Sequence, residues 1–167
     1  MGRKIKLPVG IEDFKEIRQE EFYYIDKTKL LEKLLEKWGK VNLFTRPRRF
    51  GKTLNMSMLR YFFEIGTDES LFDGLYIKNN KKICEEYMGK FPVIFLTFKD
   101  VKFDSWEATI DKIRVLLQAE FGRHRELMNS ENIAEYEKQY FFKIMNGTAT
   151  EVELTSALEI LSRMLAE

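Results

Sequence analysis

Residues 41–54 read VNLFTRPRRFGKTL, and this stretch decides which fold the sequence predicts. It begins with the short apolar run from Val41 to Thr45, which is typical of a buried strand. A loop from Arg46 to Gly51 follows. A helix is then expected from about Lys52 to Glu64, because apolar residues recur there at helical spacing. The stretch therefore predicts a strand, a loop and a helix in direct succession.

Gly51, Lys52 and Thr53 stand where a phosphate-binding loop (P-loop) carries the same residues. In such a loop, backbone N–H groups and the positive end of a helix dipole favour a polyphosphate. The glycine permits close backbone approach, the lysine ammonium contacts the outer phosphates, and the threonine hydroxyl ligates Mg²⁺. The full pattern also has a glycine where this chain has Arg46. The pattern alone therefore leaves open a helix that starts at a glycine and carries an exposed lysine.

Apolar spacing also predicts the elements that precede this stretch. Residues 1–24 are expected to be extended or loop, because Pro8 and Gly10 interrupt them. From Lys27 the pattern is helical, and Gly39 ends the run. The apolar positions of that helix are Leu30, Leu31, Leu34, Leu35 and Trp38.

Helical patterns and one further apolar run follow the loop. Short helical pieces are expected over 67–90, and the run at 91–98 predicts a second strand. Asp104 with Glu107 is expected to cap a long helix. The remaining expected helices cover about 131–145 and the chain from Thr150 onward, where Glu153 completes a capping box.

Composition excludes several classes of protein. The 167 residues fit one domain, and 44% of them are hydrophobic, which is enough for a core. Lys and Arg number 28 against 27 Asp and Glu, so the net charge of +1 produces no overall attraction to nucleic acid or anionic membrane. No apolar run reaches the roughly 20 residues of a transmembrane helix. The basic N-terminus lacks the apolar stretch of a secretory signal, so we expect a cytoplasmic protein.

The single cysteine and single histidine exclude an intrachain disulfide and a Cys/His zinc site. Cys84 is expected as a small buried residue. His124 stands among charged residues and is expected at the surface. Trp38 and Trp106 are expected in the core.

The stretch from Val41 to Leu59 resembles the signature of the bacterial AAA-ATPase-like family. Two upstream blocks, from Leu7 to Phe14 and from Tyr23 to Thr28, fit the same family at the expected distance. The resemblance covers nearly the whole chain, as the N-terminal part of the ATPase domain. The family tolerates an arginine in place of the first glycine. Many members also carry a C-terminal PD-(D/E)XK nuclease-like domain, which the resemblance implies as a partner downstream.

The fold that this resemblance implies for residues 1–167 is α/β, a helix-rich, partial three-layer core of an AAA-like P-loop NTPase. Its sheet is expected to be incomplete in this chain, because the family's Walker B strand lies further downstream and no such strand follows Glu153. The run at 91–98 would be the second core strand, not adjacent to the strand at 41–45. Asp100 just after that run is the internal candidate for an acidic Mg²⁺ ligand, and a solvent-facing charge is the alternative. We therefore expect a fragment that hydrolyses ATP poorly on its own.

The nucleotide site is also implied by the resemblance, with ATP and Mg²⁺ as the cofactors. Gly51, Lys52 and Thr53 would bind the phosphates, and Thr53 would ligate the metal. Asp26 belongs to a segment that contacts adenine in related ATPases, and a helix cap over a packed tyrosine pair is the alternative. The remaining expected nucleotide-binding residues are Arg46, Pro47, Arg48, Arg49, Phe50 and Leu54. No catalytic residue is assigned.

Two further hypotheses stay open at this level. One is a nucleic-acid-binding or nuclease-associated module with a degenerate P-loop. It rests on the stretch from Lys37 to Phe63, which holds seven basic residues and no acidic one. The other is a protein-interaction part of a regulatory ATPase, for which no sequence feature names a partner.

Overall fold

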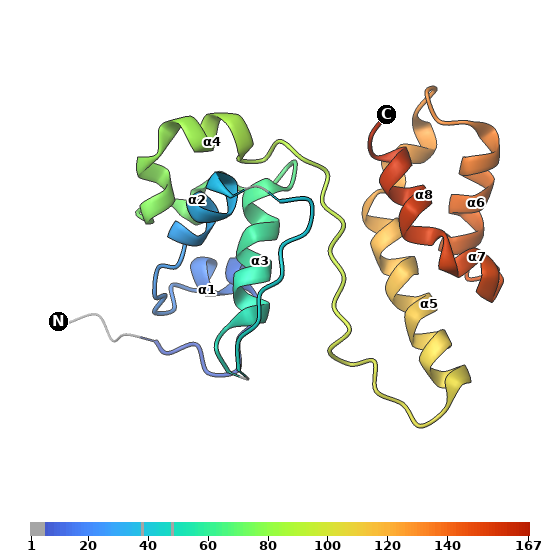
Figure 1. The fold of residues 1–167 in the computed structure, drawn as a ribbon, viewed down its shortest axis with the longest axis horizontal. Helices are drawn as coiled ribbons and strands as arrows, with labels where there is room; N and C mark the ends of the chain where they lie inside the picture. The colour runs from blue at the N-terminus through green and yellow to red at the C-terminus, as the bar shows by residue number, and fades with distance from the viewer. Residues whose placement is uncertain (1–5, 38, 48) are drawn as a thin grey trace. The chain divides into compact units, whose positions relative to one another are not determined.

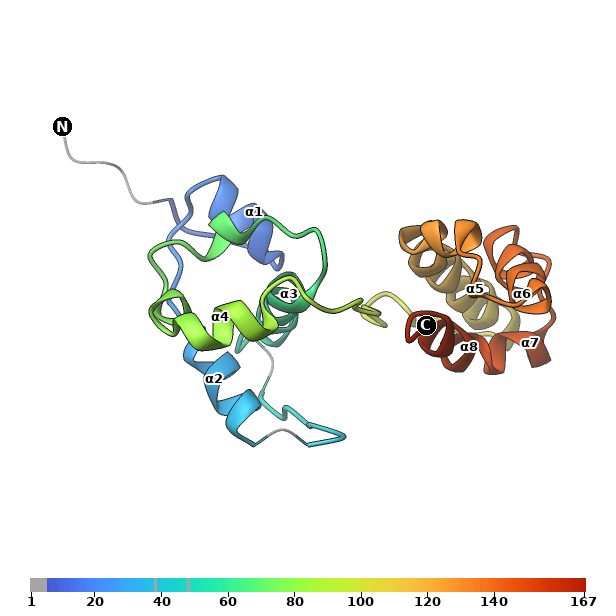
Figure 2. The same ribbon diagram turned by 90° about the horizontal axis from the view of Figure 1, so that it is seen from above.

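A computed structural model describes residues 6–37, 39–47 and 49–167, and these residues form two compact units. The N-terminal unit extends to Val93, and the C-terminal unit runs from Ile94 to Glu167. Each unit has a hydrophobic core of its own and is built of short helices (Figures 1 and 2). The predicted core residue Trp38 and the predicted site residue Arg48 lie outside the described residues.

The expected α/β three-layer P-loop core is wrong, because the described residues form helices and no β-strand. Their β-pairing is limited to isolated bridges, from Lys6 to Phe22 and from Glu64 to Phe91. The run at 41–45 is irregular backbone, in which Val41 is 85% and Leu43 is 84% exposed. The run at 91–98 is also irregular beyond its first residue. An apolar run favours burial, but a strand forms only where another strand pairs with its N–H and C=O groups.

The N-terminal unit is built around the helix that follows the glycine-lysine-threonine sequence. Its elements are α1 (Phe14–Gln19), α2 (Lys29–Glu36), α3 (Lys52–Phe63), the 3-10 helices η1 (Glu69–Phe72) and η2 (Tyr76–Asn79), and α4 (Lys81–Tyr87). Phe62 of α3 packs edge-on against Phe72, with ring centroids 5.5 Å apart. Phe14 of α1 lies 5.0 Å from the same ring. These three rings are fully buried and form the centre of the unit's core.

Local patterns predicted most of these helices correctly. The helices expected from Lys27 and from Lys52 are confirmed as α2 and α3, and the short pieces over 67–90 are confirmed as η1, η2 and α4. Helix α1 was expected as extended chain or loop, so that prediction is wrong. The side chain of Asp13 accepts a hydrogen bond from the N–H of Glu16 at 2.9 Å and caps this helix. An aspartate three residues before a glutamate is the signal that could have revealed it.

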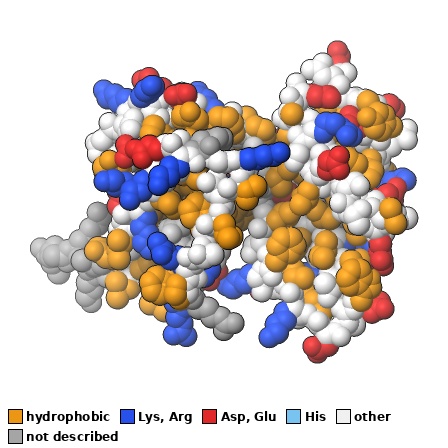
Figure 3. All heavy atoms as spheres, viewed as in Figure 1, with side chains coloured by type: hydrophobic (Ala, Val, Ile, Leu, Met, Phe, Trp, Pro, Cys, Tyr) orange, Lys and Arg blue, Asp and Glu red, His pale blue; other side chains and the backbone are white. Residues whose placement is uncertain are grey.

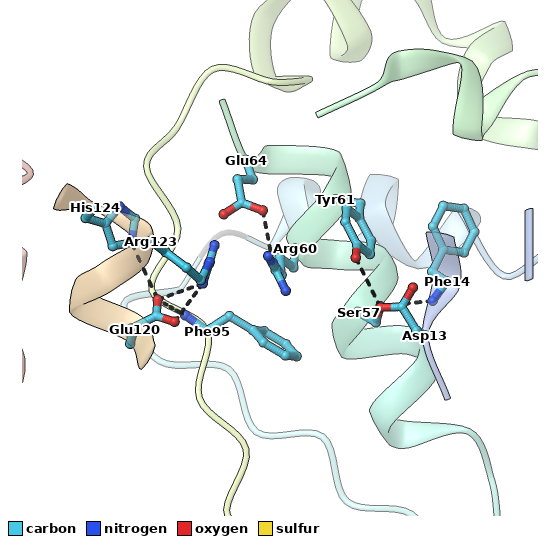
Figure 4. A network of polar contacts seen from close by, with 10 residues as sticks. All are labelled: Asp13, Phe14, Ser57, Arg60, Tyr61, Glu64, Phe95, Glu120, Arg123 and His124. Carbon is cyan, nitrogen blue, oxygen red and sulfur yellow. Dashed lines mark hydrogen bonds and ion pairs between the residues drawn. The ribbon is translucent and has the colours of Figure 1, made fainter. Parts of the chain in front are cut away.

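Asp13 also connects α1 to α3, as Figure 4 shows. Its Oδ2 accepts hydrogen bonds from the hydroxyls of Ser57 and Tyr61, both at 3.1 Å. The Ser57 hydroxyl in turn accepts from the N–H of Phe14 at 3.0 Å. Because buried polar groups are costly unless paired, this network favours one position of α3 relative to α1. The network therefore fixes the position of α3, and the loop of residues 46–51 precedes the N-terminus of this helix.

The C-terminal unit is a small helical bundle. Its elements are α5 (Trp106–Arg123), the 3-10 helix η3 (Arg125–Asn129), α6 (Glu135–Met145), α7 (Glu151–Thr155) and α8 (Ala157–Met164). Helix α5 packs against α6, and α8 packs against α6 and α7. Phe121 and Phe141 meet in the core with ring centroids 4.9 Å apart.

Several predictions for this unit can be judged. The capping box of Thr150 and Glu153 is confirmed at the start of α7, although the helix breaks at Ser156 before α8. The cap of α5 is Ser105 and not Asp104, because the Ser105 side chain accepts from the N–H of Ala108. Trp106 was expected in the core and is 63% exposed, at the first position of α5.

His124 was expected at the surface, and that prediction is wrong, because this C-cap residue of α5 is only 5% exposed. Glu120 is 3% exposed and accepts hydrogen bonds from the Arg123 guanidinium at 2.7 and 2.8 Å (Figure 4). The N–H of Phe95 donates to the same carboxylate at 2.8 Å. The Nε2 atom of His124 lies 3.5 Å from it. The i, i+3 and i, i+4 spacings bring these side chains to one side of α5.

Candidate functional site

The loop ahead of α3 turns through two residues with left-handed backbone. Arg49 has a φ of 68°, and Gly51, the N-cap of α3, has a φ of 69° and a ψ of 30°. Left-handed backbone costs a non-glycine residue about 1–2 kcal/mol, so a glycine suits position 51 and Arg49 is held there by the rest of the loop. The N–H of Asn55 donates to the Gly51 carbonyl at 2.9 Å. The three amides before Asn55 therefore have no acceptor within the helix and face the loop.

The side chain of Lys52 folds back over this loop. Its ammonium donates to the carbonyl oxygens of Arg46 at 2.7 Å and Pro47 at 3.0 Å. The cation thus lies beside the N-terminus of α3, where free amides and the helix dipole favour an anion. The P-loop pattern assigns this ammonium to the outer phosphates of a ligand. Its role in binding a phosphate stays a prediction.

A pocket of about 530 Å³ lies against the loop. Its walls come from the start of α2, the segment between α2 and α3, and α3 itself, and Figure 1 shows that segment running alongside α3. The lining residues are Lys27, Leu30, Asn42, Phe44, Arg46, Phe50, Lys52, Asn55, Met56 and Leu59. Among these described residues three are cationic and none is acidic. The volume lies in the range of small-molecule sites in proteins, about 300–1,000 Å³.

The pocket combines an apolar wall with positive charge. Phe50 is 58%, Met56 45% and Phe44 39% exposed, and the three side chains lie together in the lining of the pocket. Figure 3 shows Lys and Arg side chains among hydrophobic ones on one face of the N-terminal unit. Such a lining suits a ligand with a flat apolar group and an anionic group.

Asn55 adds an unsatisfied acceptor to this lining. Its Oδ1 atom is buried and has no hydrogen-bond partner within the described part of the chain. A buried polar atom left unpaired costs about 1–3 kcal/mol, and nearly all such atoms in proteins are paired. The oxygen is enclosed by the side chains around it and stays unpaired beside the cationic and apolar lining.

Apart from Arg48, the predicted site residues between 46 and 54 fall into two groups. Those that line the pocket are Arg46, Phe50 and Lys52. Those that form the loop or the first turn of α3 beside it are Pro47, Arg49, Gly51, Thr53 and Leu54. Leu54 packs against the core of the unit, so its contribution near the loop is its backbone. Arg48 lies outside the described residues, and nothing tests its role.

The carboxylate of Asp26 is hydrogen-bonded within the N-terminal unit, and Asp26 does not belong to the pocket lining. Its Oδ1 accepts from the N–H of Thr28 at 2.8 Å and from the Thr28 hydroxyl at 2.7 Å. Its Oδ2 accepts from the N–H of Tyr76 at 2.6 Å. Burial opposes ionisation, but these hydrogen bonds outweigh it and hold the pKa of Asp26 below its ordinary value. The structure thus places Asp26 as the anchor of the turn before α2.

The two tyrosines ahead of Asp26 differ in their surroundings. Tyr24 packs edge-on against Phe14 at 5.3 Å, and burial raises its pKa to about 12. Tyr23 is 52% exposed. Sequence reasoning did not assign the other lining residues to the site, because their side chains meet only in the folded chain. These residues are Lys27, Leu30, Asn42, Phe44, Asn55, Met56 and Leu59.

Two kinds of feature are absent from the described residues. No group of three or more His, Cys, Asp or Glu side chains gathers where a metal ion could be held within 6–37, 39–47 and 49–167. No described helix is long and apolar enough to cross a membrane. Asp100 lies exposed in a turn of the C-terminal unit.

Comparison with known proteins identifies the family of this chain. The sequence profile of a family described as predicted AAA-ATPase matches residues 8–158. This chain belongs to that family. The AAA-ATPase-like match includes the loop, α3 and most of the C-terminal unit. Family membership therefore suggests nucleotide binding for the chain that carries this loop.

One curated protein is similar to this member of the AAA-ATPase-like family. It is an uncharacterized protein in the vnfD 5' region of Azotobacter chroococcum mcd 1, and it is 37% identical over 99 residues. The aligned stretch is 59% of this chain and 18% of that protein, so the chain spans less than a fifth of the relative. No solved structure matches the chain.

Proposed function

We propose that this chain binds ATP with Mg²⁺ at the loop of residues 46–53. The observation that carries the proposal is the position of the Lys52 ammonium. It lies beside the start of α3, 2.7 Å from the carbonyl oxygen of Arg46 in the loop. The ammonium lines a pocket that has further cations and, among the described residues, no carboxylate. Membership of a predicted AAA-ATPase family supports the same ligand.

The roles of the residues follow from their chemistry. The amides at the start of α3 donate to phosphate oxygens, and the Lys52 ammonium exchanges its carbonyl partners for the stronger anionic acceptors. The Thr53 hydroxyl is the protein's ligand for Mg²⁺, which neutralises part of the charge of the triphosphate. Phe44 and Phe50 contact the base. The proposal concerns binding and assigns no residue to hydrolysis.

Isothermal titration calorimetry with ATP and Mg²⁺ tests this proposal on the full chain. We expect the wild type to bind, and the variant Lys52→Met to bind at least about tenfold more weakly, because a charge-assisted hydrogen bond is lost. Lys33→Met is the matched control, since Lys33 is exposed on α2 and lies outside the pocket lining. Wild type that binds no nucleotide, or a Lys52→Met variant that binds as well as wild type, would contradict the proposal.

A duplex DNA titration separates this proposal from the nucleic-acid hypothesis. If the basic stretch from Lys37 to Phe63 binds nucleic acid, affinity for DNA falls steeply with salt and does not depend on ATP. We expect no salt-dependent DNA binding at concentrations where ATP binds. Salt-dependent DNA binding without ATP binding would favour the alternative.

A further inference from the structure

The turn that precedes α2 is held at two points by the N-terminal unit itself. The Asp26 carboxylate accepts from the N–H and the hydroxyl of Thr28 and from the N–H of Tyr76. Thr28 is completely buried, and its Oγ1 accepts from the N–H of Ile77 at 3.1 Å. The two residues on either side of Lys27 are therefore anchored to η2. This anchoring determines where the Lys27 side chain starts.

Lys27 lies at the glycine of the loop, although 24 residues separate the two in the sequence. Its Nζ would be 3.7 Å from a Cβ atom built on Gly51, and the side chain lines the pocket. The ammonium has no ion-pair partner among the residues that the structure describes. By contrast, Lys29, the first residue of α2, lies 5.5 Å over the ring of Tyr76, so its cation has a partner.

Positive charge therefore reaches this loop from two separate elements. Lys52 and Arg46 come from the loop and α3, and Lys27 comes from the turn before α2. Two ammonium groups near one backbone turn repel each other unless an anion lies between them. A chain of phosphates supplies several negative charges in a row, so it can contact cations that come from separate elements.

We propose that Lys27 is a second phosphate-binding lysine, which makes affinity depend on the number of phosphates in the nucleotide. This inference rests on the proposed ATP site. It assigns each residue of the Asp26-Lys27-Thr28 sequence a role. Asp26 and Thr28 position the turn, and Lys27 contacts the ligand.

Calorimetry with a series of ligands tests the inference, with AMP, ADP, ATP and inorganic triphosphate as the probes. We expect Lys27→Met to weaken ATP and inorganic triphosphate about tenfold and AMP by less than about threefold, because one charge-assisted hydrogen bond to the phosphate chain is lost. Lys27→Arg should retain most of the affinity for ATP, since it keeps the positive charge. Lys33→Met, a neutralisation on α2 outside the pocket lining, should leave all four affinities within about twofold.

The outcomes distinguish this inference from the proposed function. If Lys27→Met binds ATP as tightly as wild type while Lys52→Met does not, the ATP site stands and the role of Lys27 is wrong. If Lys27→Met weakens AMP as much as ATP, or leaves inorganic triphosphate unaffected, Lys27 does not bind the phosphate chain. Wild type that binds neither ATP nor inorganic triphosphate overturns both proposals. Thermal unfolding of Lys27→Met should match wild type, which shows that the variant is folded.

Discussion

The Lys52 ammonium lies 2.7 Å from the backbone carbonyl oxygen of Arg46, six residues earlier in the chain. This contact closes the loop and holds a cation at the N-terminus of α3. A cation there opposes the helix dipole, which is unfavourable by about 0.3–1 kcal/mol at an exposed helix end. Neutral carbonyl oxygens are weaker acceptors for an ammonium than phosphate oxygens are. The Lys52 ammonium therefore adds little to the stability of the loop, and an anionic acceptor would bind it more strongly than the two carbonyls do.

Lys52→Met should for this reason separate binding from stability. We expect the free energy of unfolding of the variant to stay within about 1 kcal/mol of wild type, because the lost carbonyl contacts are exposed and the dipole repulsion disappears. Urea unfolding followed by circular dichroism measures it. A loss well above that value would mean that Lys52 is needed mainly to maintain the loop.

Gly51→Ala should destabilise the N-terminal unit without a steric clash. A Cβ at this position meets only the Lys27 ammonium at 3.7 Å, which is an ordinary contact. The φ of 69° is the source of the cost, about 1–2 kcal/mol for an L-residue in the left-handed region. Gly122→Ala in α5 is the control, because its new Cβ also meets only one ordinary contact, at 3.8 Å, and alanine favours a helix. Hydrogen exchange of the amides in each helix measures both, and equal effects of the two variants would contradict the expectation.

Thr28→Val should cost the N-terminal unit about 2–4 kcal/mol. The substitution keeps the shape of the side chain but removes the acceptor for the N–H of Ile77 and the donor to Asp26. A buried N–H that loses its acceptor costs about 1–3 kcal/mol, and the bond to a carboxylate adds to it. Thr28→Ser retains the hydroxyl and should lose about 1 kcal/mol or less, for one methyl group. If urea unfolding shows the valine variant to be as stable as the serine variant, the hydroxyl is not what anchors the turn.

Glu153 should make the stability of the C-terminal unit depend on pH. Hydrogen bonds from Lys143 and from the backbone and hydroxyl of Thr150 lower the pKa of Glu153 to about 2. The unfolded chain has the ordinary value of 4.5, so protonation favours the unfolded state. The stabilisation is complete above about pH 4.5 and disappears as the pH falls toward about 2.

The variant Glu153→Gln tests this dependence, because it removes the titrating group and keeps an acceptor for the capping box. Melting temperatures by circular dichroism from about pH 6 to about pH 2 should show wild type above the variant at the upper end and the difference shrinking on acidification. If the melting temperatures of wild type and variant fall in parallel as the pH is lowered, another carboxylate is responsible for the loss of stability in acid.

Glu120→Ala should destabilise the C-terminal unit by about 3 kcal/mol or more. The buried carboxylate accepts from Arg123 and from the N–H of Phe95, and its loss removes the acceptor that both use. Glu120→Gln should cost less, because the amide oxygen still accepts from the N–H of Phe95. Urea unfolding gives the order of stability, and a glutamine variant less stable than the alanine variant would contradict this account.

The helices and their caps were open to prediction because the interactions that form them are local. Apolar spacing predicted α2 and α3, and the spacing of Thr150 and Glu153 predicted the capping box of α7. The contact between the Lys52 ammonium and the Arg46 carbonyl is also local, since six positions separate the two residues. In each case the interacting residues lie within about six positions of one another.

Two missed features, the Asp13 cap of α1 and the Ser105 cap of α5, are local. The other missed features depend on residues that are far apart in the chain. The run at 41–45 is apolar enough for a strand, but pairing needs a second strand, and the described residues supply none there. The burial of His124 depends on how α5 packs in its bundle. Nothing in the sequence Asp26-Lys27-Thr28 distinguishes the residue that anchors from the one that lines the pocket. The roles are decided by distant neighbours: Tyr76, about 50 residues from Asp26, and Gly51, about 24 residues from Lys27. Burial and hydrogen bonding between such distant segments arise only when the chain has folded.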